Sequence, residues 1–281
     1  MSQGTITLVP VGGLANRMKA IDAAYHLAKD CGSKLQVIWF KDKGLNCRFD
    51  QLFQHPTDPI ITIQEARPCD LLLEDRPRKK NFFLPWLPEH LKYDACIYER
   101  QATQLFYNHF DYAAWAKGRK VYLASCVYFY PQPDDKLFKL FKPIASLQQR
   151  IDACSEHFNE HTIGIHIRRT DNIASITQSP TELFIKKMSR IIEQHPDATF
   201  YLATDSEEEK QKLKQVFGER ISMSGHAAER NSLQGMQDAL VELYTLSRTS
   251  RIIGSMQSSY SETAAQIGRI QCEFINKEEG V

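Results

Sequence analysis

The spacing of apolar residues near the start of the chain changes from that of a strand to that of a helix. Ile6–Val11 is a short apolar run, the glycines Gly12-Gly13 follow it, and apolar positions then recur every three or four residues over 14–28. Leu35–Phe40 is a second apolar run bounded by turn residues. This pattern predicts a strand, a glycine loop, a helix and a second strand parallel to the first.

A second alternation of strands and helices begins after Pro143. Between 47 and 143 the pattern predicts only one strand, Val121–Ser125. The later predicted strands are Thr162–Ile167, Thr199–Ala203 and Arg251–Gly254, and the predicted helices are Ile144–Phe158, Glu207–Phe217 after the capping residues of Thr204-Asp205-Ser206, Leu233–Ser247, Ser258–Gly268, and one that ends near His195. The Ser179-Pro180-Thr181-Glu182 segment is either a capping box that opens this last helix or an ordinary polar loop. We expect an α/β protein of two Rossmann-like domains, 1–145 and 146–281, with ligands at the carboxyl ends of strands.

Composition narrows the class of protein. The 35 Lys and Arg residues balance 34 Asp and Glu residues, so no overall charge indicates binding to nucleic acid. The seven cysteines are widely spaced and form no Cys-x-x-Cys pair, which argues against a disulfide framework and a zinc ribbon. No run of 18 apolar residues and no basic leader is present in the sequence. We expect a cytoplasmic globular protein.

The hexapeptide from His166 to Asp171 carries the strongest chemical signal. Two guanidiniums at the mouth of an apolar strand need an anion, and the fork of an arginine matches phosphate oxygens. Arg168 is the candidate for a pyrophosphate contact, with an Arg–Asp ion pair as the alternative. Arg169 is expected to face the scaffold, because adjacent strand residues point to opposite sides.

Two further segments are candidates for binding an anion. Ser258-Ser259 begins a predicted helix, where free backbone N–H groups favour phosphate, although simple N-capping explains these serines as well. The loop from Gly12 to Arg17, which includes Asn16, allows close approach of a ligand to the backbone. It matches neither the dinucleotide fingerprint nor the P-loop, so both of these are excluded.

Four motifs in this order resemble those of the α1,2-, α1,6- and protein O-fucosyltransferase superfamily. They are Gly-Gly-Leu-Ala-Asn-Arg (12–17), His-Ile-Arg-Arg-Thr-Asp (166–171), Ala-Thr-Asp-Ser (203–206) and Ser-Ser-Tyr-Ser-Glu-Thr-Ala (258–264). The Arg-Arg-Thr-Asp form is similar to the α1,6 and nodulation branch. The resemblance implies a GT-B-like fold and an inverting, metal-independent transfer of fucose from GDP-fucose, with no other cofactor. The implied acceptor is a glycan or a lipid-linked oligosaccharide, in the synthesis of a bacterial surface polysaccharide.

The resemblance also assigns roles to residues. Arg168 would hold the β-phosphate, where a cation stabilises the charge that develops as the anomeric bond breaks. His166 and Glu242 would lie against the guanine, and Ser258 and Ser259 would contact phosphate or ribose. Asn16, Arg17 and Asp205 complete the donor-binding set that the motifs imply.

The catalytic base is less well defined by the motifs. Enzymes of the α1,6 type have a glutamate shortly after this motif, whereas 172–176 of this chain holds no carboxylate. Asp171 is therefore the leading candidate, with Glu182 second, unless Asp171 only pairs with Arg169. A loose, oxocarbenium-like route that needs little help from a base fits either assignment.

Several features of the sequence allow more than one interpretation. The donor could be GDP-mannose or a UDP-sugar, because phosphate contacts do not read the sugar, and the missing glutamate also fits a non-catalytic binding module. Arg76–Leu87 combines cations with aromatic residues, and either touches the inner membrane peripherally or packs on the N-terminal domain. The His-x-x-Glu-His pattern at 157–161 lacks an obvious third ligand and is read as a helix end. An aromatic group either stacks on a sugar or belongs to the core: Tyr122, Tyr128, Phe129 and Tyr130.

Overall fold

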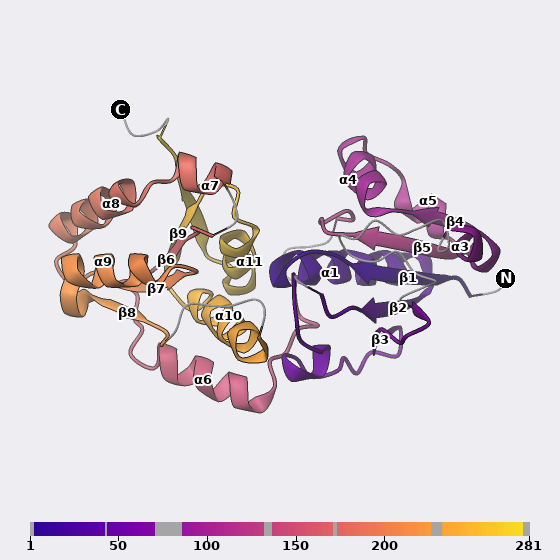
Figure 1. Cartoon of the computed structure of the whole chain (residues 1–281), viewed down its shortest axis with the longest axis horizontal. Helices are drawn as coiled ribbons and strands as arrows, with labels where there is room; N and C mark the ends of the chain where they lie inside the picture. Colours follow the sequence, from indigo (N-terminus) through magenta and orange to yellow (C-terminus); the bar gives the residue numbers. More distant parts are fainter. Residues whose placement is uncertain are drawn as a thin grey trace. The chain divides into compact units, whose positions relative to one another are not determined.

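The computed structural model of the chain describes residues 3–42, 44–70, 86–131, 137–170, 173–225 and 232–277. The chain divides into two compact units, Met1–Ile144 (unit 1) and Ala145–Val281 (unit 2). Each unit contains one five-stranded sheet with helices packed against it (Figure 1). The fold is therefore of the α/β class, as the alternation of strands and helices predicts.

Unit 1 is built on a parallel sheet with the strand order β3-β2-β1-β5-β4. Its strands are β1 (Thr5–Pro10), β2 (Lys34–Trp39), β3 (Ile61–Glu65), β4 (Ala95–Ile97) and β5 (Lys120–Ser125), and its described helices are α1 (Leu14–Cys31), η1 (Phe49–Gln51), α3 (Trp86–Lys92), α4 (Glu99–Tyr107) and α5 (Tyr112–Ala116). Helix α1 follows β1 directly and ends at Gly32, whose left-handed backbone (φ 62°) lets its N–H bond the last carbonyls of the helix.

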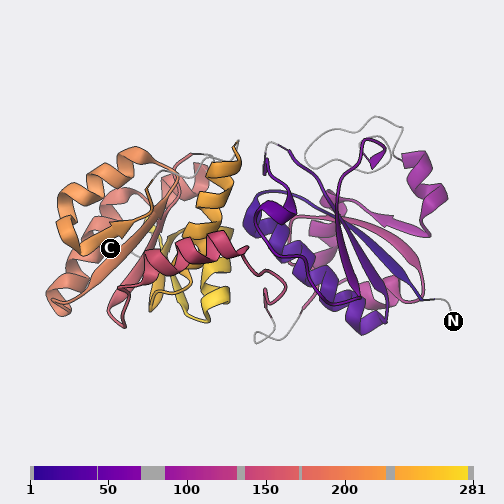
Figure 2. The same ribbon diagram turned by 90° about the horizontal axis from the view of Figure 1, so that it is seen from below.

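Unit 2 repeats the plan, with the strand order β10-β9-β6-β7-β8 and every strand pair parallel. Its strands are β6 (Thr162–Ile167), β7 (Thr199–Thr204), β8 (Ile221–Met223), β9 (Arg251–Ser255) and β10 (Gln271–Ile275), and its described helices are α6 (Ala145–Ser155), α7 (Ile173–Gln178), α8 (Thr181–Gln194), α9 (Glu207–Phe217), η3 (Gly218–Arg220), α10 (Leu233–Leu246) and α11 (Ser259–Gly268). Figure 2 shows the sheet of this unit between its helices.

The chain order of unit 2 creates a switch point beside its central strand. Strands β7 and β8 extend the sheet on one side of β6, and β9 and β10 extend it on the other. Ligands of open parallel sheets bind at such a point, outside the carboxyl ends of the strands. The loops after β6, β7 and β9 meet there, so this edge of unit 2 is the place where a site is expected.

Strands that the sequence pattern did not predict lie toward the outside of both sheets. They are β3, β4, β8 and β10. The predicted capping box before α8 is wrong in detail: the N-cap is Pro180 and makes no side-chain bond. The Ser179 hydroxyl instead donates to Ile275 O at 2.6 Å and accepts from Met256 N at 2.9 Å. Ser179 thus ties the start of α8 to the ends of β9 and β10.

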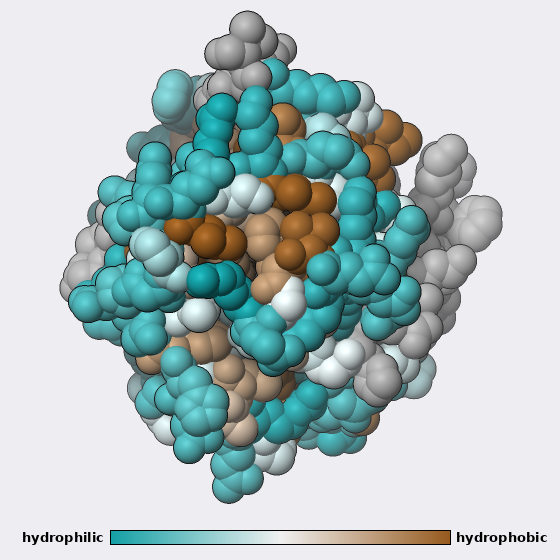
Figure 3. Space-filling model, turned by 90° about the vertical axis from the view of Figure 1, so that its left-hand side faces the viewer, coloured by the Kyte–Doolittle hydropathy of each residue, from teal (hydrophilic) through white to brown (hydrophobic). Residues whose placement is uncertain are grey.

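The face of unit 2 that Figure 3 shows is largely polar. In this view, the left-hand side of the molecule in Figure 1 is turned toward the reader, and mostly hydrophilic residues surround the apolar ones. Among the described residues, no helix combines the length and the apolar character needed to cross a membrane. Most of the basic, aromatic Arg76–Leu87 segment lies outside the described residues; at its end, Leu87 is exposed.

Candidate functional site

Arg168 leaves the central strand of unit 2 at the switch point. All six residues of β6 are buried, so the strand delivers the following residues to a fixed place. The backbone N–H of Arg168 donates to Ser255 Oγ, at the end of β9, at 3.1 Å. Its guanidinium Nη1 lies 3.1 Å from Asp205 Oδ2, just after β7. Arg168 therefore stands between the ends of three strands, with its side chain 14% exposed.

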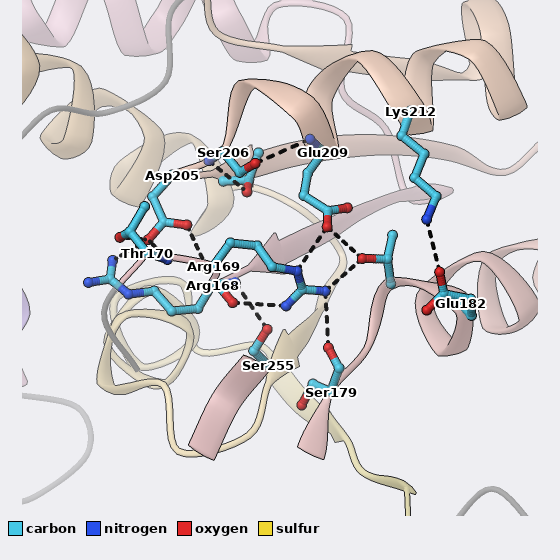
Figure 4. A network of polar contacts seen from close by, with 12 residues as sticks. Arg168, Arg169, Thr170, Ser179, Glu182, Asp205, Ser206, Glu209, Lys212 and Ser255 are labelled. Carbon is cyan, nitrogen blue, oxygen red and sulfur yellow. Dashed lines mark hydrogen bonds and ion pairs between the residues drawn. The ribbon is translucent and has the colours of Figure 1, made fainter. Parts of the chain in front are cut away.

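Asp205 accepts bonds from the whole start of the loop after β6 (Figure 4). Its carboxylate accepts from the backbone N–H groups of Arg169 at 2.7 Å and Thr170 at 3.3 Å, and from the Thr170 hydroxyl at 2.6 Å. With the Arg168 ion pair, this carboxylate holds backbone and guanidinium together. Of the two readings of Arg168, the structure shows the ion pair with an aspartate, and binding of a phosphate stays a prediction.

The side chain of Arg169 points away from Asp205 and into the scaffold, on the side opposite to that of Arg168, as the sequence predicts (Figure 4). Its side chain is 12% exposed and pairs with Glu209 on α9 at 2.9 Å. Further donors reach Arg168 O, Ser179 O and Thr181 Oγ1 at 2.8, 3.1 and 2.8 Å. Neither Glu209 nor Thr181 was identified from the sequence, because Arg169 follows a strand, whereas Thr181 lies on α8 and Glu209 lies on α9.

His166 is buried beside this loop and is held by two serines of the β9–α11 segment. Its Nδ1 lies 2.7 Å from Ser261 Oγ and 3.2 Å from Ser258 Oγ, and its ring stacks on Tyr260 at 4.8 Å between centroids. Burial lowers the pKa of His166 to about 3, and the neighbouring charge of Arg168 acts in the same direction. The ring is therefore neutral near pH 7. Ser261 was missed from the sequence, although its place three residues after Ser258 puts both on one helix face.

Ser258 and Ser259 begin helix α11. Ser258 is its N-cap and accepts from Ser261 N, so the capping role is shown for Ser258. Contact of Ser258 and Ser259 with phosphate or ribose stays a prediction.

Glu242 lies on α10 in a buried polar cluster with Lys210 and Ser224. The Ser224 hydroxyl donates to Glu242 Oε1, and Lys210 Nζ lies 3.8 Å from the same oxygen. Lys210 Nζ also donates to Ser224 O at 3.2 Å. Burial raises the pKa of Glu242 to about 7, against the effects of Ser224 and Lys210. Its predicted contact with guanine is not tested by this arrangement.

The glycine loop of unit 1 is held by Arg17 from within. The buried guanidinium donates from Nε to Gly12 O at 2.9 Å and from Nη1 to Phe40 O at 2.5 Å, and its Nη2 pairs with Asp42 at 2.9 Å. Arg17 therefore has a structural role in the loop between β1 and α1. Asn16 is half-buried in the first turn of α1. Donor binding by either residue stays a prediction.

The structure leaves the catalytic base open. Asp171 lies outside the described residues. Glu182 pairs with Lys212 at 2.9 Å, and this hydrogen bond lowers the pKa of Glu182. The carboxylate of Glu182 therefore stays ionised at a largely exposed position.

The structure also shows the surroundings of the His-x-x-Glu-His pattern at 157–161 and of the aromatic group. His161 contacts Glu160 and Asp197, and the described residues include no group of three or more His, Cys, Asp or Glu placed to hold a metal. Of the aromatic group, Tyr122 and Phe129 are buried core residues, and the Tyr130 hydroxyl donates to Asp30 at 2.7 Å. The core explanation therefore holds for Tyr122 and Phe129.

Comparison with known proteins places this geometry in a known fold. No protein-family model matches the chain, and no curated protein sequence matches it. Among solved structures, NodZ alpha-1,6-fucosyltransferase soaked with GDP-fucose aligns with a TM-score of 0.64 at 16% identity, over 95% of this chain and 93% of NodZ. NodZ from Bradyrhizobium gives a TM-score of 0.62 at 16% identity, over 94% and 92% of the two chains. The chain has the fold of this fucosyltransferase.

Two further solved structures share the same fold. A mutant of Arabidopsis thaliana FUT1 in complex with GDP aligns with a TM-score of 0.60 at 16% identity, over 96% of this chain and 70% of FUT1. POFUT1 in complex with GDP aligns with a TM-score of 0.56 at 10% identity, over 97% of this chain and 99% of POFUT1. The GT-B-like architecture implied by the motifs is therefore confirmed as a fold.

Proposed function

We propose that this protein is a glycosyltransferase that transfers fucose from GDP-fucose to a glycan acceptor. The observation that carries the proposal is the position of Arg168 at the switch point of unit 2, in a fold shared with NodZ soaked with GDP-fucose. The donor would bind unit 2, with Asp205, His166, Glu242, Ser258 and Ser259 around it. Unit 1 would receive the acceptor.

The reaction would proceed with inversion at the anomeric carbon. The acceptor hydroxyl oxygen attacks this carbon of fucose while the bond from the carbon to the β-phosphate oxygen breaks, and GDP leaves with both bonding electrons. Negative charge develops on the diphosphate, where the donors of Arg168 stabilise it more strongly than in the bound donor. Because this cation is part of the chain, we propose that the transfer needs no divalent metal.

The proton of the acceptor hydroxyl needs a receiver. We assign it to the carboxylate of Asp171, on the basis of its place two residues after the motif arginines. A loose transition state lowers the demand on this base, because the sugar carries positive charge before the new bond is complete. Asp171→Asn would then slow transfer and leave donor binding unchanged.

The decisive test combines donor binding and turnover. GDP and GDP-fucose at about 100 times their dissociation constants should raise the melting temperature by the equivalent of about 2.7 kcal/mol, with or without EDTA. Arg168→Ala should lower GDP-fucose turnover at least ~10²-fold, as loss of a transition-state donor does. Arg190→Ala, at an exposed position on α8, is the matched arginine control and should behave as wild type.

The outcomes separate the proposal from its competitors. A larger shift with GDP-mannose or a UDP-sugar would identify a different donor. Tight GDP binding with no turnover over a broad acceptor panel would indicate a binding module. Absence of a shift with every nucleotide would overturn the proposed function.

A further inference from the structure

The side chain of Arg169 joins three segments of unit 2 in a closed ring of hydrogen bonds (Figure 4). Arg169 Nε donates to Glu209 Oε1 at 2.9 Å, and Nη2 donates to Thr181 Oγ1 at 2.8 Å. The Thr181 hydroxyl donates in turn to Glu209 Oε1 at 2.6 Å. We call these three residues the Arg169 clamp. It connects the end of β6 with the first turns of α8 and α9.

The clamp is built for a charge that is mostly removed from water. The side chains of Arg169 and Glu209 are each 12% exposed, so the carboxylate balances the guanidinium in a region of low polarity. The Thr181 hydroxyl accepts from one partner and donates to the other. Serine would keep this double role, whereas valine, which has nearly the same shape, would lose it.

The clamp also acts directly on the peptide that carries Arg168. Arg169 Nη1 donates to Arg168 O at 2.8 Å, while Arg168 N is held by Ser255 and Arg169 N by Asp205. The carbonyl and both neighbouring N–H groups are thus fixed from three sides. A shift of the clamp would displace this peptide and with it the guanidinium of Arg168.

We propose that Glu209 and Thr181 are positioning residues that act through Arg169 on the guanidinium of Arg168. The inference rests on the proposed function, since it concerns the group that would hold the donor phosphate. Stabilisation of a transition state depends on placement to within a fraction of an ångström, and a misplacement of about 1 Å can cost ~10²-fold in rate. Ground-state binding of GDP tolerates a larger displacement.

A purely structural role of the clamp would be to tie α8 to α9. The same two helices carry a second tie at the surface, where Lys212 Nζ lies 2.9 Å from Glu182 Oε1 with side chains 43% and 72% exposed. Lys212→Met removes that tie without touching the peptide of Arg168. It is therefore the matched control for a helix-to-helix contact.

The experiment compares Thr181→Val, Thr181→Ser, Glu209→Gln and Lys212→Met in the full chain. For each, we would measure kcat and KM for GDP-fucose hydrolysis, the Kd for GDP by calorimetry, and amide hydrogen exchange of a peptide spanning 166–170. Thr181→Val and Glu209→Gln should lower kcat at least ~10-fold while the Kd for GDP changes less than ~3-fold. Exchange of the 168–170 amides should become at least ~10-fold faster in both. Thr181→Ser and Lys212→Met should match wild type.

The contrary outcomes are distinct. Equal losses in Lys212→Met and Thr181→Val, or unchanged kcat and amide exchange in Thr181→Val and Glu209→Gln, would overturn the positioning role. Parallel loss of kcat and GDP affinity would also overturn it, because it would show uniform binding. A wild-type protein that neither binds GDP nor hydrolyses GDP-fucose would overturn the proposed function instead, independently of the amide exchange result.

Discussion

Arg168 and Arg169 are neighbours in the chain, but their guanidiniums pair with different carboxylates. Their side chains leave the end of β6 on opposite sides, one toward Asp205 and the other toward Glu209. Each guanidinium already has a carboxylate partner, so the described part of the site is charge-balanced before any ligand arrives. A phosphate that binds Arg168 would compete with Asp205 for a guanidinium whose orientation is set in advance.

Glu242 makes the stability of the protein depend on pH in a defined direction. Its carboxyl is buried and its pKa is raised to about 7, so the folded state binds its proton more tightly than the unfolded chain. The contribution of this bound proton to the free energy of unfolding is complete below pH 4.5 and is lost as the pH rises through 7. Glu242→Gln should therefore gain stability relative to wild type between pH 5 and pH 8, by up to about 3 kcal/mol. Urea unfolding at several pH values measures this difference.

His166 acts in the opposite direction over a lower pH range. Its pKa is lowered to about 3, so the unfolded chain binds the proton more tightly and stability falls as the pH drops below 6.5. His166 is present in both proteins, and its contribution cancels when Glu242→Gln is compared with wild type.

The control for the Glu242 prediction is Glu208→Gln, at an exposed position, which should show no such pH dependence. A stability difference between Glu242→Gln and wild type that stays constant from pH 5 to pH 8 would contradict the assignment.

Among the elements, the motif-bearing strands were predictable, whereas the strands at the edges of the two sheets, β3, β4, β8 and β10, were not. Strand β6 is six residues long, apolar or small except for His166 and buried throughout, and its predicted bounds are confirmed. Strands β4 and β8 have only three residues each, too few for a periodic pattern. The capping box predicted at Ser179 is absent because the Ser179 hydroxyl forms hydrogen bonds with the backbone of Ile275 and Met256, which are distant in sequence.

The same reason limits prediction of the candidate site. Arg168, His166 and Asp205 stand in motifs directly after or within predicted strands, and the parallel sheet brings the ends of these strands to one edge. The partners Glu209 and Thr181 reach Arg169 only through the packing of α8 and α9 on the sheet. No spacing in the sequence encodes that contact.

Packing of α11 on β9 depends on Gly254. A Cβ at this position would lie 2.4 Å from Ser261 Oγ and 2.7 Å from Ser261 Cβ. Gly254→Ala should therefore push α11 outward, loosen the contact of Ser261 with His166, and lower the free energy of unfolding by about 1–3 kcal/mol. Urea denaturation of the variant measures the loss.

Two companion variants separate this clash from a general effect of losing a glycine. A Cβ at Gly225 would meet no atom of the described residues within 4 Å, so Gly225→Ala should leave stability within about 0.5 kcal/mol of wild type. Adding Ser261→Gly to Gly254→Ala removes the atoms that clash and should make the Gly254 substitution less costly. Equal losses for Gly254→Ala and Gly225→Ala would show that the contact with Ser261 is unimportant.

At the scale of the whole molecule, the two units carry separate sheets and separate cores. Every proposed donor contact except Asn16 and Arg17 belongs to unit 2. Arg17 is buried within the loop of unit 1, where its guanidinium donates hydrogen bonds to the carbonyl groups of Gly12 and Phe40 and pairs with the carboxylate of Asp42. Donor binding should therefore depend mainly on unit 2, and transfer to an acceptor on both units.

A fragment of residues 145–281 should fold alone and bind GDP with a Kd within about tenfold of the full chain, which is about 1.4 kcal/mol. Circular dichroism would establish folding, and calorimetry would measure GDP binding by the fragment and by its Arg168→Ala variant, in which binding should be strongly weakened. The same fragment should not transfer fucose, since the acceptor side is absent. A folded fragment that fails to bind GDP, beside a full chain that binds it, would show that unit 1 contributes to GDP binding. In that case the motif at 12–17, whose loop Arg17 holds, would be the first candidate in unit 1 for contact with the nucleotide.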